Sequence, residues 1–182
     1  MNKSELRQEL KLRRNSMTSE EVLEKSDKIC NQIIKSDFFK NAETVMVYLS
    51  FKNEVNTRKI IEKAISEKKK VLVPVTSGDD MFLSVLDDLT SLKKGNFGIE
   101  EPSVIKKWSG EIDICRIPAL GFEKAGGRIG FGKGYYDKFL SKNSCIKIGI
   151  AYSDQIKENV FSEPHDIPMD IVVTEEEMFF IE

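Results

Sequence analysis

Histidine and cysteine, the side chains that most often hold zinc or carry out nucleophilic catalysis, are scarce in this sequence. The 182 residues include one histidine, His165, and three cysteines, Cys30, Cys115 and Cys145. A structural zinc site needs a cluster of such ligands, so none is expected. A Ser-His-Asp or Cys-His mechanism would have to depend on His165 alone. The odd number and wide spacing of the cysteines indicate buried thiols in a reducing compartment rather than disulfides.

Long apolar stretches and an excess of positive charge are also missing. No run approaches the roughly 20 apolar residues of a membrane span. The charged N-terminus lacks the apolar core of a secretion signal, which predicts a cytoplasmic protein with no membrane partner. The net charge of −2 argues against nucleic-acid binding, which usually needs a basic excess. We expect a monomer that acts on a small molecule.

Glycine is sparse overall but concentrated in one segment. Five of the eleven glycines are Gly126, Gly127, Gly130, Gly132 and Gly134. Glycine lets backbone amides turn toward a ligand and lets the chain approach it closely. The segment leads into a helix-like run whose first amides attract anions, and Arg128 and Lys133 add positive charge. We therefore predict a polyphosphate site here, the alternative being a flexible surface loop.

This loop matches neither of the common nucleotide-binding fingerprints. Gly127, Gly132 and Lys133 fit the spacing G-x-x-x-x-G-K, but Gly134 stands where a P-loop has the serine or threonine that binds Mg²⁺. The dinucleotide pattern fails as well, because Tyr135 occupies the position of its third glycine. The loop is therefore suited to phosphate without belonging to either motif.

Strand-like and helix-like segments alternate along the chain. Helices are predicted at 2–14, at 18–35, from a Thr57 cap through Ile65, and at 135–141. Strands are predicted at 44–50, 70–75, 81–86, 112–120, 145–151 and 170–174. Residues 90–110 are expected to be irregular. Several strands are apolar on both faces, which predicts one domain over 1–182 with a three-layer α/β/α sandwich and a mostly parallel central sheet. Ligands bind beyond the carboxyl ends of such strands. The glycine loop and residues 51–56 both follow such ends.

Asp137 lies in the first turn of the helix that should face the phosphates. A carboxylate there can simply stabilise the helix N-terminus. Beside a polyphosphate it would be repelled unless a divalent cation lay between them, and Mg²⁺ binds through one or two carboxylates plus substrate phosphates. Asp166 and Asp170 are candidates for a second carboxylate, although each also reads as a turn or cap residue.

Two further groups of residues can be interpreted either as functional or as ordinary structural and surface residues. Lys3, Arg7 and Arg14 share one side of the first helix, which indicates either a cationic clamp over phosphates or an ordinary solvated face. Glu54 follows a buried strand and could accept paired N–H groups of an amino-heterocycle, or it could be a loop carboxylate. Phe131, which stands among glycines, is the aromatic residue least easily explained as core.

The run Pro118-Ala-Leu-Gly-Phe-Glu-x-x-Gly-x-Arg128-Ile-Gly-x-Gly-x-Gly-Tyr-Tyr-Asp-Lys-Phe-Leu140 resembles the signature of the 5-formyltetrahydrofolate cyclo-ligase family, also called 5,10-methenyltetrahydrofolate synthetase. The similarity covers nearly the whole chain. Supporting segments are Lys3-x-x-x-Arg7, Tyr48 to Thr57, Phe97-Gly-Ile-Glu-Glu-Pro102 and His165 to Thr174. Lys138, where the family more often has arginine, is a modest departure.

The resemblance implies ATP- and Mg²⁺-dependent cyclisation of 5-formyltetrahydrofolate, possibly polyglutamylated, to 5,10-methenyltetrahydrofolate with release of ADP and phosphate. It implies ATP contacts from Lys3, Ser4, Glu5, Leu6, Arg7, Arg128, Ile129, Gly130, Phe131, Gly132, Lys133, Gly134, Tyr135 and Tyr136. It assigns Glu54, Phe131, Gly132, Lys133, Gly134 and Tyr135 to the folate. Asp137 and Asp166, rather than Asp170, would hold Mg²⁺. The catalytic set would be Lys3, Arg128, Lys133 and Asp137.

Two other functions remain compatible with the sequence. A non-catalytic folate- or nucleotide-binding protein would bind both ligands without turnover. An α/β sugar-phosphate isomerase or acyl-transferase relative would share the sheet but need no ATP. If the cyclo-ligase hypothesis is correct, Asp137→Ala should remove activity and leave the fold largely intact, and Glu54→Ala should weaken folate binding more than ATP binding.

Overall fold

The computed structural model describes residues 1–95 and 98–182. Its α-helices over these residues are α1 (Lys3–Asn15), α2 (Ser19–Lys35), α3 (Asp37–Asn41), α4 (Arg58–Ser66) and α5 (Tyr135–Lys142). Capping boxes begin α1, through Asn2 and Glu5, and α2, through Thr18 and Glu21. The second of these confirms the cap predicted from Thr-Ser-Glu-Glu, in which each side chain accepts a hydrogen bond from the other residue's amide.

The central sheet has eight strands in the order β13-β12-β10-β7-β1-β2-β3-β6. The strands are β13 (Met178–Phe180), β12 (Ile171–Val173), β10 (Ile146–Ile150), β7 (Ile114–Pro118), β1 (Thr44–Met46), β2 (Lys70–Ser77), β3 (Asp80–Val85) and β6 (Lys107–Trp108). The five from β12 to β2 are parallel, and β13, β3 and β6 pair antiparallel at the edges. The predicted mostly parallel α/β sheet is confirmed.

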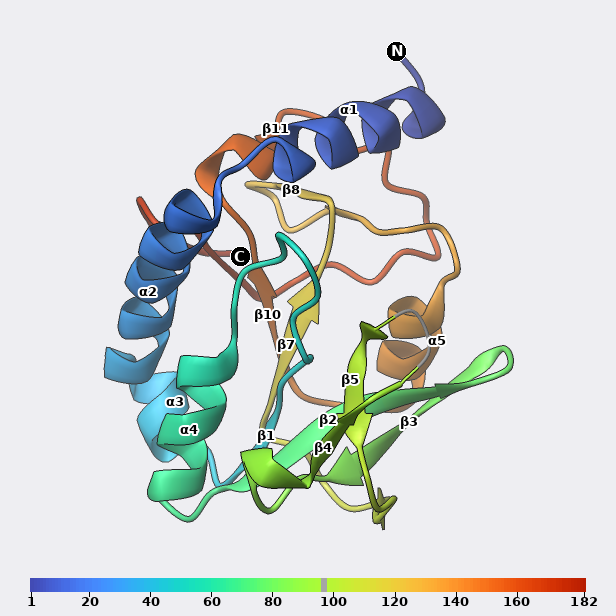
Figure 1. The fold of residues 1–182 in the computed structure, drawn as a ribbon. Coiled ribbons are helices and arrows are strands. Elements are labelled where there is room, and N and C mark those ends of the chain that lie inside the picture. The colour runs from blue at the N-terminus through green and yellow to red at the C-terminus, as the bar shows by residue number, and fades with distance from the viewer. Residues whose placement is uncertain (96–97) are drawn as a thin grey trace.

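Helices cover both faces of this sheet, as Figure 1 shows, with α2, α3 and α4 on one side and α5 on the other. On the first side, Ile33, Phe39 and Ile60 pack with sheet residues such as Val45 and Ile148. On the second side, Leu140 of α5 packs with a different set of sheet residues, which includes Met46, Leu72, Cys115, Ile117 and Val172. Burial of both faces explains why the strands are apolar runs rather than alternating ones.

A second, smaller sheet supports the glycine-rich segment. It has the order β11 (Ile156–Lys157), β8 (Gly121–Glu123) and β9 (Arg128–Ile129). Leu6 and Leu10 of α1 pack on this sheet, against Leu120, Ile129 and Val160. Because β9 leads directly into the glycine loop, this packing brings the N-terminal helix over that loop.

Residues 90–110 differ from the irregular segment that was predicted. Short strands β4 (Leu92–Lys94) and β5 (Glu100–Pro102) form a hairpin, and β6 joins the edge of the main sheet. Asn96 and Phe97 lie outside the described residues, so the Phe97 part of the proposed family segment has no structural account here. Two- and three-residue strands give too short an alternating pattern to be recognised by periodicity.

Thr57 occupies the position before α4, but the prediction that its side chain caps the helix is wrong. Its hydroxyl instead donates a 2.6 Å hydrogen bond to the Tyr48 carbonyl, and α4 has no side-chain cap bond. This bond ties the start of α4 to the chain leaving β1. None of the described helices is both long and apolar enough to cross a membrane.

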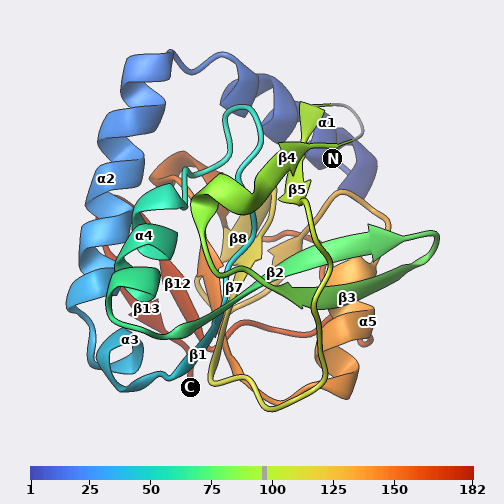
Figure 2. The ribbon, with the colours of Figure 1, turned by 60° about the horizontal axis from the view of Figure 1, so that its bottom comes forward.

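The long β2–β3 hairpin extends from the sheet alongside α5, as the turned view in Figure 2 also shows. At its tip the Gly78 carbonyl accepts a 2.7 Å hydrogen bond from the Tyr135 hydroxyl. Asp80 forms an ion pair with Lys138 on the next turn of α5. The hairpin is therefore tied to the helix that follows the glycine loop.

Candidate active site

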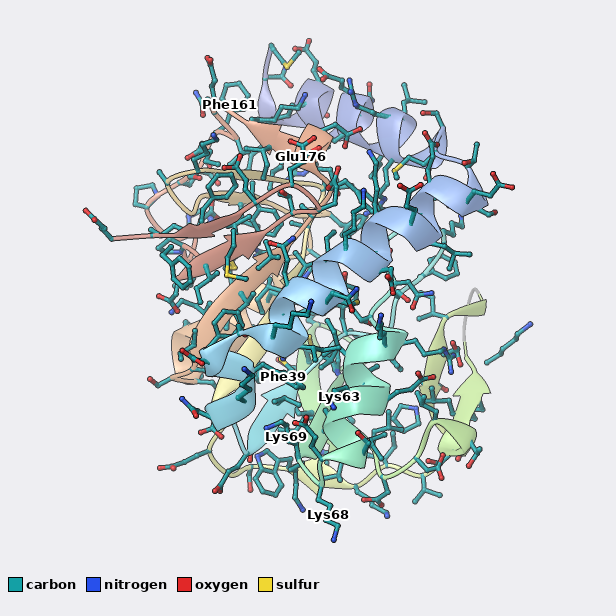
Figure 3. The ribbon with its side chains drawn as sticks, turned by 90° about the vertical axis from the view of Figure 1, so that its left-hand side faces the viewer. Phe39, Lys63, Lys68, Lys69, Phe161 and Glu176 are labelled. Atoms are coloured by element: carbon teal, nitrogen blue, oxygen red, sulfur yellow. The ribbon has the colours of Figure 1, made fainter. Side chains whose placement is uncertain are left out.

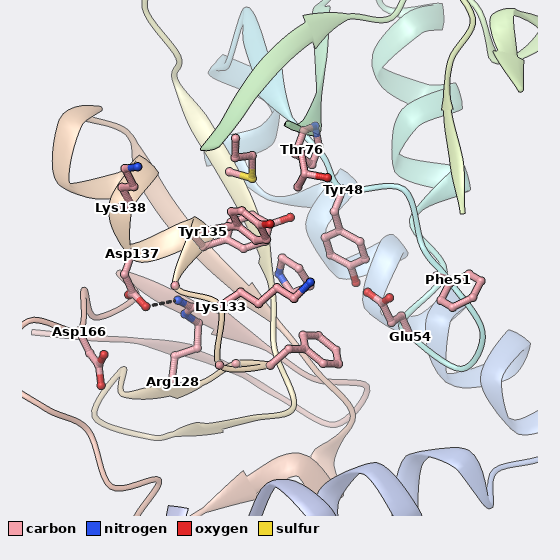
Figure 4. A pocket seen from close by; sticks show the side chains of 18 of the residues that line it. Tyr48, Phe51, Glu54, Thr76, Arg128, Lys133, Tyr135, Asp137, Lys138 and Asp166 are labelled. Carbon is pink, nitrogen blue, oxygen red and sulfur yellow. Dashed lines mark hydrogen bonds and ion pairs between the residues drawn. The ribbon is translucent and has the colours of Figure 1, made fainter. Parts of the chain in front are cut away.

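A cavity of about 940 Å³ opens at the carboxyl ends of β1, β2 and β7. Figure 4 shows side chains from several segments converging on it. The glycine loop, α1, the segment after β1 and residues 163–166 all contribute. The lining residues include Lys3, Arg7, Tyr48, Phe51, Glu54, Thr76, Pro118, Arg128, Gly130 to Lys138, Glu163, His165 and Asp166. The predicted edge of the sheet is therefore the edge that holds the cavity.

The glycine loop is shaped to present backbone amides to this cavity. Gly132 has φ +100° and Gly134 has φ +70°, a region that favours glycine. Gly134 precedes α5 and offers no side-chain cap, so the first amides of α5 have no side-chain acceptor from this position. Uncapped helix amides beside basic side chains form a suitable anion site.

The N-terminal helix closes over the loop. Arg7 donates a 3.0 Å hydrogen bond from Nε to the Gly130 carbonyl. A Cβ atom at Gly132 would lie 3.6 Å from the Arg7 guanidinium carbon. Two segments 123 residues apart in sequence thus form one wall of the cavity.

The predicted nucleotide-binding residues divide into two groups in the structure. Lys3 and Arg7 line the cavity, as do Arg128 and the run from Gly130 to Tyr136. The other four have different surroundings. Ser4 is exposed, Glu5 caps α1, and Leu6 and Ile129 are buried in the small core beneath α1. Within α1, helical periodicity explains the division, because residues three and four apart, such as Lys3 and Arg7, share a helix face.

Arg128 and Asp137 form the central ion pair of the site. The Arg128 Nη2 atom donates a 2.8 Å hydrogen bond to Asp137 Oδ2, and the Arg128 side chain is only 6% exposed. The other Asp137 oxygen accepts a 3.1 Å bond from the Ile167 amide. The Arg128 guanidinium also lies 5.8 Å from the centre of the Tyr136 ring. Asp137 is therefore already held by a cation from its own chain.

Asp166 lies in a second charged cluster on the cavity wall. Its Oδ2 atom accepts hydrogen bonds from Lys3 Nζ at 3.3 Å and from the Glu163 amide at 2.8 Å. Burial acts to raise the pKa of Asp166, but the Glu163 amide and the Lys3 ammonium outweigh it and hold that pKa below its ordinary value. Asp166 is consequently ionised at neutral pH.

Glu163 and His165 were not among the predicted site residues. Together with Asp166 they form a group whose ligand atoms all lie within 4.8 Å of one another, as the described residues show. A lone histidine and a glutamate two residues apart in a loop gave no periodic signal. Asp170, by contrast, immediately precedes β12, and its carboxylate accepts a hydrogen bond from the Lys147 amide and forms an ion pair with the Lys147 ammonium.

Asp137 and Asp166 are suitable ligands for a hard divalent cation. Both line the same cavity, and the Ile167 amide that Asp137 binds belongs to the residue following Asp166. Carboxylate oxygens on a wall shared with an anion site match the preferences of Mg²⁺. Each carboxylate is now neutralised by a side chain, Arg128 or Lys3, which a metal ion would replace in part.

The opposite end of the cavity is aromatic and holds one carboxylate. Figure 4 shows Glu54 beside Tyr48 and Phe51, across the cavity from the Arg128–Asp137 pair. Burial raises the pKa of Glu54 to about 7, although the Arg14 charge and the Phe51 amide act in the opposite direction. Tyr48 donates a 3.0 Å hydrogen bond to the Val55 carbonyl, which fixes the ring beside the carboxylate. This end suits a flat, nitrogen-rich ring.

Phe131 of the glycine loop also lines the cavity. Its side chain is 48% exposed, and the cationic groups of Arg14 and Lys11 lie 5.4 and 5.9 Å from its ring centre. These distances fit cation–π contacts. Arg14 and Lys11 therefore interact with the Phe131 ring, although neither residue lines the cavity.

Several lining residues were missed by sequence reasoning. Pro74, Val75 and Thr76 end β2, so the same edge rule that found Glu54 would have found them. Ile99, Glu100 and Glu101 come from the β4–β5 hairpin that was expected to be irregular. Glu100 also pairs with Arg58 at 2.8 Å, which connects the hairpin to α4.

Comparisons with known proteins identify the family to which this chain belongs. A family model described as the 5-formyltetrahydrofolate cyclo-ligase family matches residues 1–175. A probable 5-formyltetrahydrofolate cyclo-ligase of Caenorhabditis elegans is 33% identical, over 96% of this chain and 93% of the relative. The 5-formyltetrahydrofolate cyclo-ligase of Escherichia coli K12 is 29% identical, over 91% and 96%. The NMR structure of Aquifex aeolicus 5,10-methenyltetrahydrofolate synthetase superposes with a TM-score of 0.89 and 32% identity, over 100% of this chain and 94% of that one.

Proposed function

This chain belongs to the 5-formyltetrahydrofolate cyclo-ligase family, a family of ligase enzymes, and on that premise we propose that it converts 5-formyltetrahydrofolate and ATP to 5,10-methenyltetrahydrofolate, ADP and phosphate in a Mg²⁺-dependent reaction. One observation carries the assignment. A single cavity has a cationic, glycine-lined end and an aromatic end with one carboxylate, so it can hold a polyphosphate against a pterin.

The proposed chemistry needs positioning and charge neutralisation more than a protein nucleophile. The formyl oxygen attacks the γ-phosphorus, the bond to ADP breaks, and the formyl carbon becomes activated as a phosphate ester. N10 of the folate then attacks that carbon and releases its proton, and phosphate leaves with the former formyl oxygen. Phosphoryl transfer of this kind relies on electrostatic stabilisation. The reaction therefore needs no histidine-activated nucleophile, which agrees with the presence of a single histidine in the sequence.

Charge neutralisation is proposed to come from the basic end of the cavity. Lys3, Arg7 and Lys133 line it with cationic groups, and the amides of the glycine loop add fixed dipoles. Preorganised donors of this type stabilise the charge that develops as the phosphoryl group moves. Arg128 contributes mainly by orienting Asp137, because its guanidinium is already bound to that carboxylate.

Asp137 and Asp166 are proposed to hold the metal ion. Mg²⁺, when bound, would neutralise phosphate charge between the two carboxylates and the glycine loop. Ion pairs with Lys3 and Arg128 hold Asp166 and Asp137, respectively, in place before the ligand arrives. Glu163 and His165 stand beside Asp166, and we include Glu163 as an additional carboxylate near the metal.

Glu54 is proposed to recognise the pterin ring through its N–H groups. A carboxylate accepts two hydrogen bonds side by side, which matches an amino-heterocycle. Phe131 and Tyr135 offer planar surfaces in the same cavity. This arrangement would place the formyl group between the aromatic end and the basic end.

The decisive experiment is a turnover assay with purified, folded protein. Incubation with 5-formyltetrahydrofolate, ATP and Mg²⁺ should produce the methenyl chromophore and one ADP per product, and omission of ATP or Mg²⁺ should abolish both. Binding of both ligands without turnover would instead support a non-catalytic binding protein. Conversion without ATP would contradict the proposed phosphorylation step.

A further inference from the structure

Two cysteines that are distant in sequence bring their sulfur atoms together on one face of the central sheet. Cys115 lies in β7, and Cys145 precedes β10 by one residue. The Sγ atoms are 2.6 Å apart, and both thiols are free. Strands β7 and β10 pair in parallel with Cys115 opposite Lys147, so Cys145, two residues earlier, shares the face of Cys115. Strand pairing thus holds the two thiols in contact.

The two thiols differ in their access to solvent. Cys115 is 0% exposed and packs in the core between the sheet and α5, whereas Cys145 is half-buried at the edge of that core. The hydrogen bond with Cys115 lowers the pKa of Cys145, burial opposes this, and the Lys147 charge adds to the lowering. An accessible thiol with more thiolate character is the one that reacts with an oxidant.

We propose that Cys115 and Cys145 are a redox-active pair that hydrogen peroxide converts to an intramolecular disulfide. The Cys145 thiolate attacks one peroxide oxygen, the O–O bond breaks, and the second oxygen leaves as water after protonation. The resulting sulfenic acid on Cys145 is attacked by the Cys115 sulfur, which forms the S–S bond and releases a second water. Two thiols lose two electrons in total, and one peroxide gains them.

Cys30 provides an internal comparison. It is buried on the opposite face of the sheet, its thiol donates a hydrogen bond to the Asn56 carbonyl at 3.3 Å, and burial raises its pKa to about 11. It has no sulfur partner among the described residues. All three cysteines are free thiols, as expected from the sequence, and only Cys115 and Cys145 have the paired geometry on which the proposal rests.

The cross-link would join the connection after α5 to a central strand of the sheet. The bond would close a chain segment of 30 residues that contains the glycine loop and α5. Closing such a loop restricts the unfolded chain. We expect the oxidised protein to unfold at a temperature about 5–10 °C higher than the reduced protein. Neither cysteine lines the cavity, so this modification is separate from the proposed reaction.

Intact-mass spectrometry with hydrogen peroxide as the probe tests the proposal. Wild-type protein should lose the mass of two hydrogen atoms, its titratable thiols should fall from three to one, and dithiothreitol should reverse both changes. Peptide mapping without reductant should recover Cys115 joined to Cys145. The Cys30→Ser protein should behave in the same way.

The Cys145→Ser and Cys115→Ala proteins should lose this response. Cys145 is half-buried, so its serine variant should fold normally, as circular dichroism can verify. Gain of oxygen atoms at Cys145 in the Cys30→Ser protein, with no loss of two hydrogens, would overturn the proposal. Disulfide-linked dimers in place of the internal bond would also overturn it. Because the readout is mass, failure here leaves the proposed enzymatic activity unaffected.

Discussion

The side chain of Arg128 reaches Asp137 with a 2.8 Å hydrogen bond from a position that is only 6% exposed to solvent. This relationship changes the interpretation of Asp137. From the sequence, the aspartate is a metal ligand whose removal should leave the fold intact. In the structure it is also the partner of a buried cation, so its replacement has two separable effects.

Asp137→Ala is expected to lower both activity and stability. Removing one partner of a buried ion pair leaves the other charge uncompensated, which costs about 3–5 kcal/mol. Asp137→Asn keeps one oxygen, which can accept a hydrogen bond from Arg128 or from the Ile167 amide but not from both as now, and it should cost less. Both variants should lose turnover by at least about 100-fold through the lost electrostatic stabilisation. Thermal unfolding and Mg²⁺-dependent turnover separate the two effects.

Asp80→Asn is the matched control for that experiment. Asp80 pairs with Lys138 on the same helix, but the pair is exposed and should change stability by no more than about 1 kcal/mol. Normal turnover of Asp137→Asn at limiting Mg²⁺ would show that the carboxylate is not needed for the metal.

Folate binding is expected to strengthen as the pH rises through 7. Burial raises the pKa of Glu54 to about 7, and only its ionised form accepts two pterin N–H bonds. Below pH 7 affinity should fall about tenfold per unit, and Glu54→Gln should bind weakly at every pH. Calorimetric titration of 5-formyltetrahydrofolate between pH 5.5 and about 8.5 measures both. A flat wild-type profile would refute the assignment.

The Glu54 carboxylate should also make the stability of the folded protein depend on pH, but stability should fall as the pH rises, whereas folate binding should strengthen. Its folded pKa exceeds the ordinary value of 4.5, so the folded state binds the proton more tightly. The stabilising contribution is present below about pH 4.5 and is lost as the pH rises through about 7. Glu54→Gln should therefore unfold at a higher temperature than wild type at pH 8, with a smaller difference at pH 5. Scanning calorimetry at the two pH values measures the difference.

Arg14 is expected to tune this titration from outside the cavity. Its positive charge lowers the pKa of Glu54, so Arg14→Met should move the folate-binding profile to higher pH. Lys11→Met is the control, because Lys11 also lies near the Phe131 ring but does not contribute to the Glu54 pKa. Equal shifts in the two variants would indicate an effect through Phe131 instead.

Arg116→Met is expected to stabilise the protein. Arg116 lies in β7 with 0% exposure, none of its three side-chain nitrogens has a partner among the described residues, and its guanidinium lies 5.3 Å from the Phe39 ring centre. Figure 3 shows Phe39 between the short helix α3 and the sheet. Burial lowers the pKa of Arg116, yet an arginine stays charged at neutral pH. An apolar replacement for such a buried charge often gains about 1–4 kcal/mol.

Urea unfolding of Arg116→Met and wild type measures that gain. Ile114→Met, on the same strand and the same sheet face, is the control and should lose less than about 1.5 kcal/mol. If Arg116→Met unfolds at a lower urea concentration than wild type, the cation–π contact with Phe39 outweighs the burial penalty.

The sequence predicted those parts of the site that depend on local chain properties. The glycine cluster before a helix indicated an anion-binding loop, and apolar strand runs indicated a parallel sheet with its ligand edge near Glu54 and the loop. The structure places both at one cavity. The helix period also placed Lys3 and Arg7 on one side of α1.

Pairings between distant side chains could not be predicted in this way. Lys3 meets Asp166 across 163 residues, and the β4–β5 hairpin brings Glu100 and Glu101 to the cavity. These contacts depend on how layers pack in three dimensions, and a single sequence carries no periodic signal for them. Very short strands such as β9 and β11 were missed for a related reason, since two residues cannot display alternation.

The bond from the Tyr135 hydroxyl to the Gly78 carbonyl links the glycine loop to a hairpin tip 57 residues away. The length of that hairpin consequently sets the position of an aromatic ring in the cavity. Relatives that lengthen or trim the β2–β3 turn would be expected to differ in ligand preference even with identical glycine loops. An engineer could adjust the cavity from this solvent-facing turn without altering any residue that contacts the ligand.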